Sequence, residues 1–238
     1  MRGYGQFCPV AKAAEVFCER WTPLILRDLA GGASRFSELQ RGVPLASPTL
    51  LSRRLKALEA DGIVERRRSP GGSAWTYHLT PAGREFAPIV EALGVWGQRW
   101  ARRDLAEGEV DLGLLVWALE RYARPAALGA GPAVVRLELV DQPAAKRVWW
   151  FLNAEGRCQL CVDDPGFEVA LWLEAGLRDM IRVWRGDLTV AAALDRGVLV
   201  ADGAPAALRA LSDWLGLNPL AHVGPAEADG QAGRAPIP

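Results

Sequence analysis

Residues 47–58, SPTLLSRRLKAL, constrain the fold most, because they combine a helix start with a two-faced residue pattern. Ser47 is a favourable N-cap, and Pro48 suits the first helical position, where its missing N–H costs nothing. At 3.6 residues per turn, three leucines share one face and four polar or basic residues share the opposite face. The leucines are Leu51, Leu55 and Leu58, and the polar residues are Thr49, Ser52, Arg53 and Lys56. The pattern predicts an amphipathic helix with a core face and a basic face.

The polar face of this helix is suited to DNA. Between Arg41 and Ala57 the chain carries four basic residues and no acidic one. Such side chains can bond phosphates and base edges, and no carboxylate repels the DNA backbone. An ordinary surface helix is the alternative, but we favour a recognition helix in the major groove, with Arg53 as the candidate guanine contact. The predicted DNA-facing residues are Ser47, Thr49, Ser52, Arg53, Arg54 and Lys56.

The flanking segments place this helix in a winged helix-turn-helix. Helical patterns at residues 10–20, 21–30 and 34–43 precede it, and a helix, a tight turn and a basic helix form the DNA-binding arrangement. After the Asp61-Gly62 turn, residues 63–68 and 73–79 read as two strands around an SPGG loop. This hairpin is the predicted wing, and we expect its arginines to contact phosphate or the adjacent minor groove. They are Arg66, Arg67 and Arg68.

A long helix over residues 82–103 is expected next, with large apolar residues at alternating spacings of three and four. A stripe that includes two tryptophans is too apolar to be left in water. Packing within the chain is one explanation. We favour a dimer interface, because winged helices of this size commonly read paired half-sites as symmetric dimers. The predicted interface residues are Phe86, Ile89, Leu93, Trp96 and Trp100.

Residues 8–103 resemble the HxlR-type regulators, a branch of the MarR-like winged helix-turn-helix transcription factors. The resemblance spans about 40% of the chain. It implies a dimer on a palindromic operator, joined through the first and last helices, and it leaves repression or activation open. The matching segments, in order, are CPV (8–10), RW (20–21), LILRDL (24–29), RFSEL (35–39), SPTLLSRRLKALEADGIVERR (47–67) and YHLTPAG (77–83).

The cysteines raise a redox alternative. Many regulators of this type have a cysteine at the position of Cys8, and in several it senses oxidants or electrophiles. Cys8 lies near a predicted helix N-terminus, whose partial positive charge favours a thiolate, but we favour a family-typical packing role over redox sensing. Cys158 and Cys161 form a CxxC within a strand-like pattern, which puts the two sulfurs on opposite faces. No second ligand pair accompanies them, so we expect no metal site there.

Charge divides the chain. Residues 1–108 hold 16 Lys/Arg against 11 Asp/Glu, whereas residues 109–238 hold 12 against 17. A basic half joined to an acidic half indicates modules with different partners. We therefore expect a winged-helix domain at 1–106, a linker, a second domain at 112–217 and a disordered tail at 222–238. The predicted fold class is two-domain: a mainly α winged helix-turn-helix, then an α+β domain with a mostly antiparallel sheet covered by helices.

Residues 112–217 are similar to sterol carrier protein type 2-like domains. The similarity rests on the strand order and on WRGDLTVAAALDRG (184–197) and VLVADGAPAALRAL (198–211). Turn residues at Glu155-Gly156 and at 164–166 are expected to join adjacent antiparallel strands. The similarity implies a tunnel for an apolar ligand. Aromatic residues are expected in such a ligand site, and they are equally expected in a hydrophobic core. The candidate ligand contacts are Trp117, Trp149, Trp172 and Trp184.

Other functional classes are disfavoured. No apolar run approaches the roughly 20 residues of a membrane span, and the start lacks a signal-peptide core, so we expect a cytoplasmic protein with no membrane partner. There are two histidines, His78 and His222, and no Ser–His–acid spacing, metal cluster or phosphate loop, so we expect no enzyme, cofactor or metal. The expected partners are double-stranded DNA, a second copy and a small apolar effector. The alternatives are a lipid or small-molecule carrier in which DNA binding is secondary, and a thiol-based redox regulator through Cys8.

Overall fold

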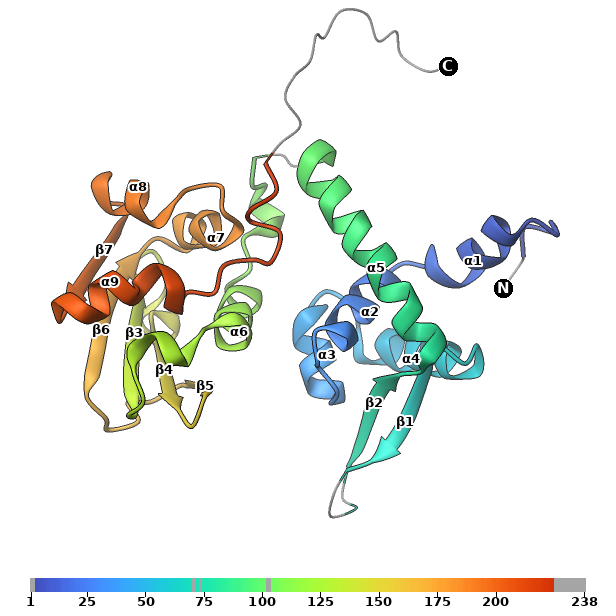
Figure 1. Ribbon diagram of the computed structural model, residues 1–238, viewed down its shortest axis with the longest axis horizontal. Helices are drawn as coiled ribbons and strands as arrows, with labels where there is room; N and C mark the ends of the chain where they lie inside the picture. The colour runs from blue at the N-terminus through green and yellow to red at the C-terminus, as the bar shows by residue number, and fades with distance from the viewer. Residues whose placement is uncertain (1–2, 70–71, 73, 102–103, 225–238) are drawn as a thin grey trace, which may run out of the picture. The chain divides into compact units, whose positions relative to one another are not determined.

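The computed structural model describes residues 3–69, 72, 74–101 and 104–224. The chain folds into two compact units, Met1–Gly94 and Val95–Pro238 (Figure 1). Each unit has its own hydrophobic core. The predicted domain border at residues 106–112 lies farther along the chain than this division. The predicted disordered tail lies outside the described residues from position 225 onward.

The first unit is mainly helical and has one two-stranded hairpin. The hairpin strands pair antiparallel, with Val64 opposite Leu79 and Arg68 opposite Trp75. This order of elements confirms the predicted winged helix-turn-helix. Its elements are α1 (Pro9–Phe17), α2 (Thr22–Ala30), α3 (Phe36–Gly42), α4 (Pro48–Ala60), β1 (Val64–Arg68), β2 (Trp75–Leu79) and α5 (Pro81–Trp96).

The leucines of α4 build the core of the first unit. Leu51, Leu55 and Leu58 are at most 2% exposed and pack in one cluster with Ile25 of α2 and Leu39 of α3. Burying one such side chain stabilises the fold by about 1.5–3 kcal/mol relative to leaving it in water. The core therefore decides which face of α4 stays outward.

The second unit is α+β. Its helices are α6 (Leu112–Tyr122), α7 (Leu177–Arg185), α8 (Val190–Asp195) and α9 (Pro205–Trp214). Its strands are β3 (Ala133–Leu139), β4 (Val148–Ala154), β5 (Arg157–Cys161), β6 (Val169–Ala175) and β7 (Leu199–Gly203). Short helical turns occupy Gly97–Ala101, Glu107–Glu109, Pro125–Leu128 (η3) and Ala144–Lys146.

The five strands form one mixed sheet in the order β5-β4-β3-β6-β7. Strands β3 and β6 are parallel, and the other three neighbouring pairs are antiparallel. Buried residues of all four helices pack in the same cluster as the inward residues of the sheet, such as Leu137, Phe151 and Leu173. Arg136, Trp150 and Trp172 share one cross-strand row that alternates with these inward positions.

One predicted turn is confirmed and the other is corrected. Glu155-Gly156 joins the antiparallel neighbours β4 and β5, with both residues at positive φ. The turn at Asp164–Gly166 forms, since the Gly166 N–H donates to Asp164 Oδ1 at 2.8 Å, but it does not connect sheet neighbours. The strand that follows it, β6, pairs in parallel with β3. Beside β3, Leu171, Leu173 and Ala175 of β6 are buried in the second core.

A buried polar pair crosses the core of the second unit. The Trp214 indole N–H donates to Asn153 Oδ1 at 2.8 Å, and both residues are at most 2% exposed. Asn153 Nδ2 donates in turn to the Ala133 and Phe151 carbonyl oxygens at 3.2 and 2.9 Å. Because an unsatisfied buried amide costs about 1–3 kcal/mol, this pair ties α9 to the sheet in one register.

Among the described residues, no helix combines the length and the hydropathy that crossing a membrane would need.

Candidate nucleic-acid interface

The turn between α3 and α4 is held by side chains of the preceding helices. Gln40 Nε2 donates to the Ala46 carbonyl oxygen at 2.7 Å, just before α4 begins. Arg27 Nη2 donates to the Gly42 carbonyl oxygen at 3.2 Å, at the end of α3. Arg27 also pairs with Asp28, which is 1% exposed, through Nε–Oδ1 at 2.9 Å. These contacts fix the angle at which α4 leaves the turn.

The outward face of α4 carries most of the predicted DNA-facing residues. Thr49, Arg53 and Lys56 are exposed, and Ser52 is half-buried. Ser47 is exposed and caps the helix, since its Oγ accepts from the Leu50 N–H at 3.2 Å. Its oxygen therefore serves the helix, while its O–H can still donate. The face carries two cations and three hydroxyl groups, of which the Ser52 hydroxyl is half-buried, a set that can bond phosphates and base edges.

Arg54 differs from the rest of the predicted set. Its Nη2 pairs with Glu19 Oε2, in the segment between α1 and α2, and its side chain is 16% exposed. It follows Arg53 by one residue, so it projects about 100° around the helix toward α1 and α2. Sequence spacing does not report this acidic partner, because Glu19 lies 35 residues away.

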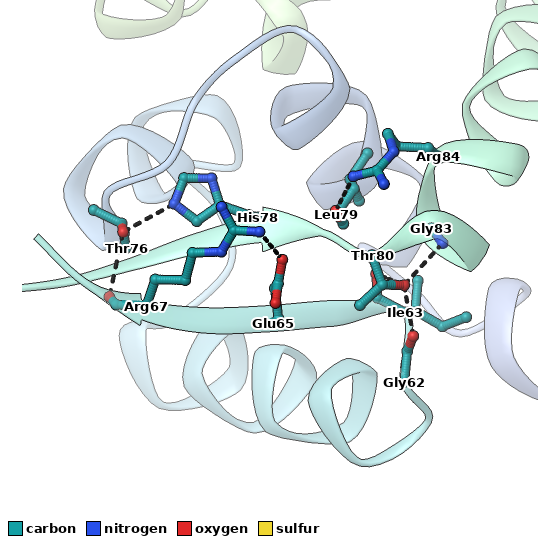
Figure 2. Close-up of polar contacts among 10 residues, drawn as sticks. All are labelled: Gly62, Ile63, Glu65, Arg67, Thr76, His78, Leu79, Thr80, Gly83 and Arg84. Atoms are coloured by element: carbon teal, nitrogen blue, oxygen red, sulfur yellow. Dashed lines mark hydrogen bonds and ion pairs between the residues drawn. The ribbon is translucent and has the colours of Figure 1, made fainter.

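The base of the wing is fixed by Thr80 and a close approach of α5 (Figure 2). Thr80 Oγ1 donates to the Gly62 carbonyl oxygen at 2.6 Å and accepts from the Gly83 N–H at 3.2 Å. A Cβ at Gly83 would lie 2.3 Å from the Ile63 carbonyl oxygen, so only glycine fits there. Arg84 Nη1 also donates to the Leu79 carbonyl oxygen at 2.8 Å. The hairpin is thereby anchored at the end opposite its loop.

The three wing arginines lie on two faces of the hairpin. Figure 2 shows Arg67 on the same side as Glu65 and His78, and Arg67 Nη2 pairs with Glu65 Oε1. Arg66 and Arg68 have the opposite strand parity and lie on the other side. Arg66 Nε is 3.8 Å from Glu59 Oε1, at the end of α4. Arg66 and Arg68 therefore lie on the side of the hairpin that faces α4, and Arg67 does not.

The predicted dimer stripe is mostly outward. Ile89, Leu93, Trp96 and Trp100 are 50–62% exposed. Phe86 is instead 8% exposed, because its ring stacks on Phe17 inside the first core. The segment before and within α1 adds Phe7 and Val10, which are 101% and 75% exposed. Such large apolar side chains in water are typical of a surface that another protein covers.

The cysteines lie in different environments. Cys8 is half-buried at the N-cap position of α1, with no side-chain cap bond. Cys158 packs against the second core, whereas Cys161 lies opposite Trp150 at the other strand parity, so the predicted opposite facing of the two thiols is confirmed. Burial and the nearby Glu120 carboxylate raise the pKa of the Cys158 thiol to about 12. The same two causes raise the pKa of Cys161. Among the described residues, no group of three or more His, Cys, Asp and Glu is placed to hold a metal ion.

The four candidate ligand tryptophans have different neighbours in the second unit. Trp117 is 6% exposed in α6, and the Trp149 indole N–H donates to the Lys146 carbonyl oxygen at 2.9 Å. Trp172 forms an edge contact with Trp150, their centroids 6.5 Å apart, and Trp184 lies near Tyr122 with centroids 5.9 Å apart. Trp172 is 43% exposed, and the indole nitrogen of Trp184 is buried without a hydrogen-bond partner.

A cavity of about 500 Å³ lies elsewhere in the second unit. It is bounded by η3, the first residues of β3, the residues around the start of β6 and the N-terminus of α9. Its lining is mostly alanine and glycine, with Leu128 from η3 and Glu168 before β6. None of the four tryptophans lines it. Its position escaped sequence analysis because alanine and glycine carry no signal for a ligand site.

Known proteins match the first part of the chain. The model of the family described as HxlR-like helix-turn-helix matches residues 16–105. The HTH-type transcriptional regulator YvaP of Bacillus subtilis is 37% identical over 97 residues, which cover 40% of this chain and 90% of that protein. An HTH-type transcriptional regulator of Methanothermobacter thermautotrophicus is 33% identical over 103 residues, 43% of this chain and 79% of that protein. Among solved structures, PA1607, described as a transcription factor, is 33% identical with a TM-score of 0.40, over 42% of this chain and 69% of that chain.

Proposed function

Through residues 16–105 the chain belongs to the HxlR-like helix-turn-helix family, and on this premise we propose that it is a dimeric DNA-binding transcriptional regulator that reads a palindromic operator. In this proposal α4 enters the major groove, and Arg66 and Arg68 of the wing contact the adjacent backbone. The observation that carries the proposal is the outward face of α4, where Thr49, Arg53 and Lys56 are exposed over a fully buried leucine face.

The dimer is supported by the apolar surface that the chain leaves in water. Ile89, Leu93 and Trp96 of α5 and Trp100 of the helical turn that follows it are each at least half exposed. Removing apolar surface from water contributes about 25 cal/mol per Å², so covering four such side chains favours association. A symmetric dimer presents two α4 helices, and a two-fold axis in the protein requires a matching palindrome in the DNA.

Selection of binding sites from a random duplex library tests this proposal. We expect enrichment of an inverted repeat whose half-sites are roughly 10–10.5 base pairs apart, or a multiple of that spacing. Light scattering after gel filtration should give twice the monomer mass. A library that yields no enriched motif at low salt, or a protein that binds DNA only as a monomer, would refute the dimeric operator-binding function.

We further propose that the second unit binds a small apolar or amphipathic effector, as the similarity to sterol carrier-like domains implies. The 500 Å³ cavity favours this role, since ligand pockets commonly measure about 300–1,000 Å³ and have mainly apolar linings. Effector control follows only if the ligand binds two dimer geometries with different affinity.

Native mass spectrometry tests the effector and the carrier alternative together. A stoichiometric apolar molecule that changes operator affinity supports the regulator. A protein that carries a bound molecule but does not bind an operator favours the lipid-carrier function. A protein that binds its operator without any bound molecule would refute the effector proposal.

A further inference from the structure

The wing carries an aromatic residue, Trp75, that packs against two of its arginines. The guanidinium carbons of Arg66 and Arg68 each lie 4.3 Å from the centroid of the Trp75 ring. Trp75 is directly opposite Arg68 in the strand ladder and diagonal to Arg66, so both side chains can reach it. The two guanidinium carbons are therefore separated by at most twice 4.3 Å.

This arrangement needs the ring. Two like charges so close together repel each other, and free arginine side chains sample many rotamers. An indole face attracts a cation that lies within about 6 Å of its centroid, and tryptophan is the strongest of the aromatic residues in this respect. Arg68 is held further by the bond from its Nη1 to the Gly72 carbonyl oxygen at 2.9 Å. Trp75 is 40% exposed, so the hydrophobic burial of its side chain is incomplete. Its contacts with the two arginines are therefore part of its contribution to the structure of the wing.

The cluster of Arg66, Arg68 and Trp75 lies on the side of the hairpin that faces α4. These residues have the strand parity of Val64 and Leu79, which are buried in the first core together with the leucines of α4. The 3.8 Å approach of Arg66 to Glu59 places the cluster beside the last turn of α4. Arg67, on the opposite face with Glu65, is not part of it.

We propose that Trp75 is a positioning residue of the DNA interface: its ring holds Arg66 and Arg68 as one preorganised pair that binds the phosphate backbone beside the groove occupied by α4. The proposal rests on the proposed DNA-binding function. A phosphate that bonds both guanidinium groups offsets their mutual repulsion, and the pair gives up little side-chain freedom on binding because Trp75 has already ordered it.

Operator affinity, measured by fluorescence anisotropy over a range of KCl concentrations, tests the role of the ring. Trp75→Leu removes the aromatic face but keeps an apolar side chain, and we expect about tenfold weaker binding, the size of one to two ordered arginines. Trp75→Phe keeps an aromatic face and should stay within about threefold of the parent, since phenylalanine attracts cations less strongly than tryptophan. A phenylalanine variant as weak as the leucine variant would overturn the inference. If the parent binds no DNA, the proposed function fails; if the parent and Trp75→Leu bind equally, only this inference fails.

A double-mutant cycle decides whether Trp75 acts through the arginines. Arg66→Gln with Arg68→Gln should lower the slope of log affinity against log salt by about two, because each lost phosphate contact removes about 0.9. In that background Trp75→Leu should cause no further loss. An unchanged salt slope in the arginine variant would show that the arginines do not bind phosphate, and a loss from Trp75→Leu that persists would show that the ring touches DNA itself. Either result overturns the inference.

Discussion

Arg54 of α4 forms an ion pair with Glu19, whereas its neighbour Arg53 is exposed on the outward face of the same helix. The two arginines are adjacent in sequence and identical in chemistry. Their roles are separated by about 100° of helix rotation and by one distant carboxylate. We therefore expect Arg53 to serve recognition and Arg54 to join α4 to the segment before α2.

Replacing the two arginines separately tests this division. Arg53→Ala should weaken operator binding by about 1–3 kcal/mol and relax sequence preference at one base pair. Arg54→Ala should leave affinity near that of the parent and lower the free energy of unfolding by about 1–2 kcal/mol, since the pair is only partly exposed. Glu19→Gln is the control, because it breaks the same ion pair from the other side. The assignment is reversed if Arg54→Ala costs more affinity than Arg53→Ala.

Substitutions of the wing arginines should also differ in how much operator affinity they cost. Arg67→Gln removes a cation that is paired with Glu65 on the face away from α4, so operator affinity should fall by less than about threefold. Arg68→Gln, one residue along on the cluster face, should cost more and should reduce the salt slope by about one. Titrations of both variants at several salt concentrations provide the comparison, and equal losses would contradict the two-faced wing.

Two substitutions in α5 test association and folding separately. Leu93→Asp places a charge on an exposed apolar position, so we expect a folded protein that is monomeric at micromolar concentration by light scattering. Phe86→Ala, on the same helix, removes a ring that is stacked on Phe17 in the core. It should lower the free energy of unfolding by about 3–5 kcal/mol without a specific effect on association. A dimeric Leu93→Asp protein would locate the interface elsewhere.

Thiol reactivity should follow exposure. Burial raises the pKa of Cys158 to about 12, so its thiolate is scarce at pH 8 and alkylation there should require unfolding. Cys18, which is exposed, and Cys8, which is half-buried, should be alkylated first, as peptide mass mapping would report. Because the folded state keeps the Cys158 proton above the ordinary cysteine pKa, the free energy of unfolding should fall as pH rises from about 9 toward 12.

The same experiment bears on Cys8. Loss of operator binding when Cys8 alone is modified, together with resistance of a Cys8→Ser variant, would support the redox alternative. Unchanged operator binding after complete modification of Cys8 would refute the redox alternative. Rapid labelling of Cys158 in the folded protein at pH 8 would contradict its burial.

The cavity gives a matched pair of variants on α9. Ala206 lines the cavity and is exposed, so Ala206→Trp should fill the space with little cost in stability. Leu208 is exposed on the same helix and is not among the lining residues, so Leu208→Trp is the control. With 1-anilinonaphthalene-8-sulfonate as the probe, we expect fluorescence enhancement for the parent and Leu208→Trp and its loss for Ala206→Trp. Equal enhancement in all three would place the binding site outside this cavity.

Local patterns in the sequence determined the DNA-binding unit. Ser47, Pro48 and the leucine spacing specify the start and the buried face of α4 without reference to distant residues, and the Pro/Gly loop specifies the hairpin. The resemblance to the HxlR-type regulators was confirmed over residues 16–105, where it rests on short contiguous motifs. The alternation of β5 likewise predicted that Cys158 and Cys161 face opposite ways.

Only the tertiary structure decided which of these side chains are exposed and which are already paired within the chain. Glu19 pairs with Arg54 and Phe17 stacks on Phe86, each from a position distant along the chain, and Trp75 contacts Arg66 and Arg68 from the opposite strand of the hairpin. The parallel pairing of β6 with β3 and the cavity beside η3 also depend on packing between segments far apart in sequence. Periodicity reports which face of an element is apolar, because that property is local. It does not report which charge, ring or strand lies across from that face, because folding alone brings those partners together.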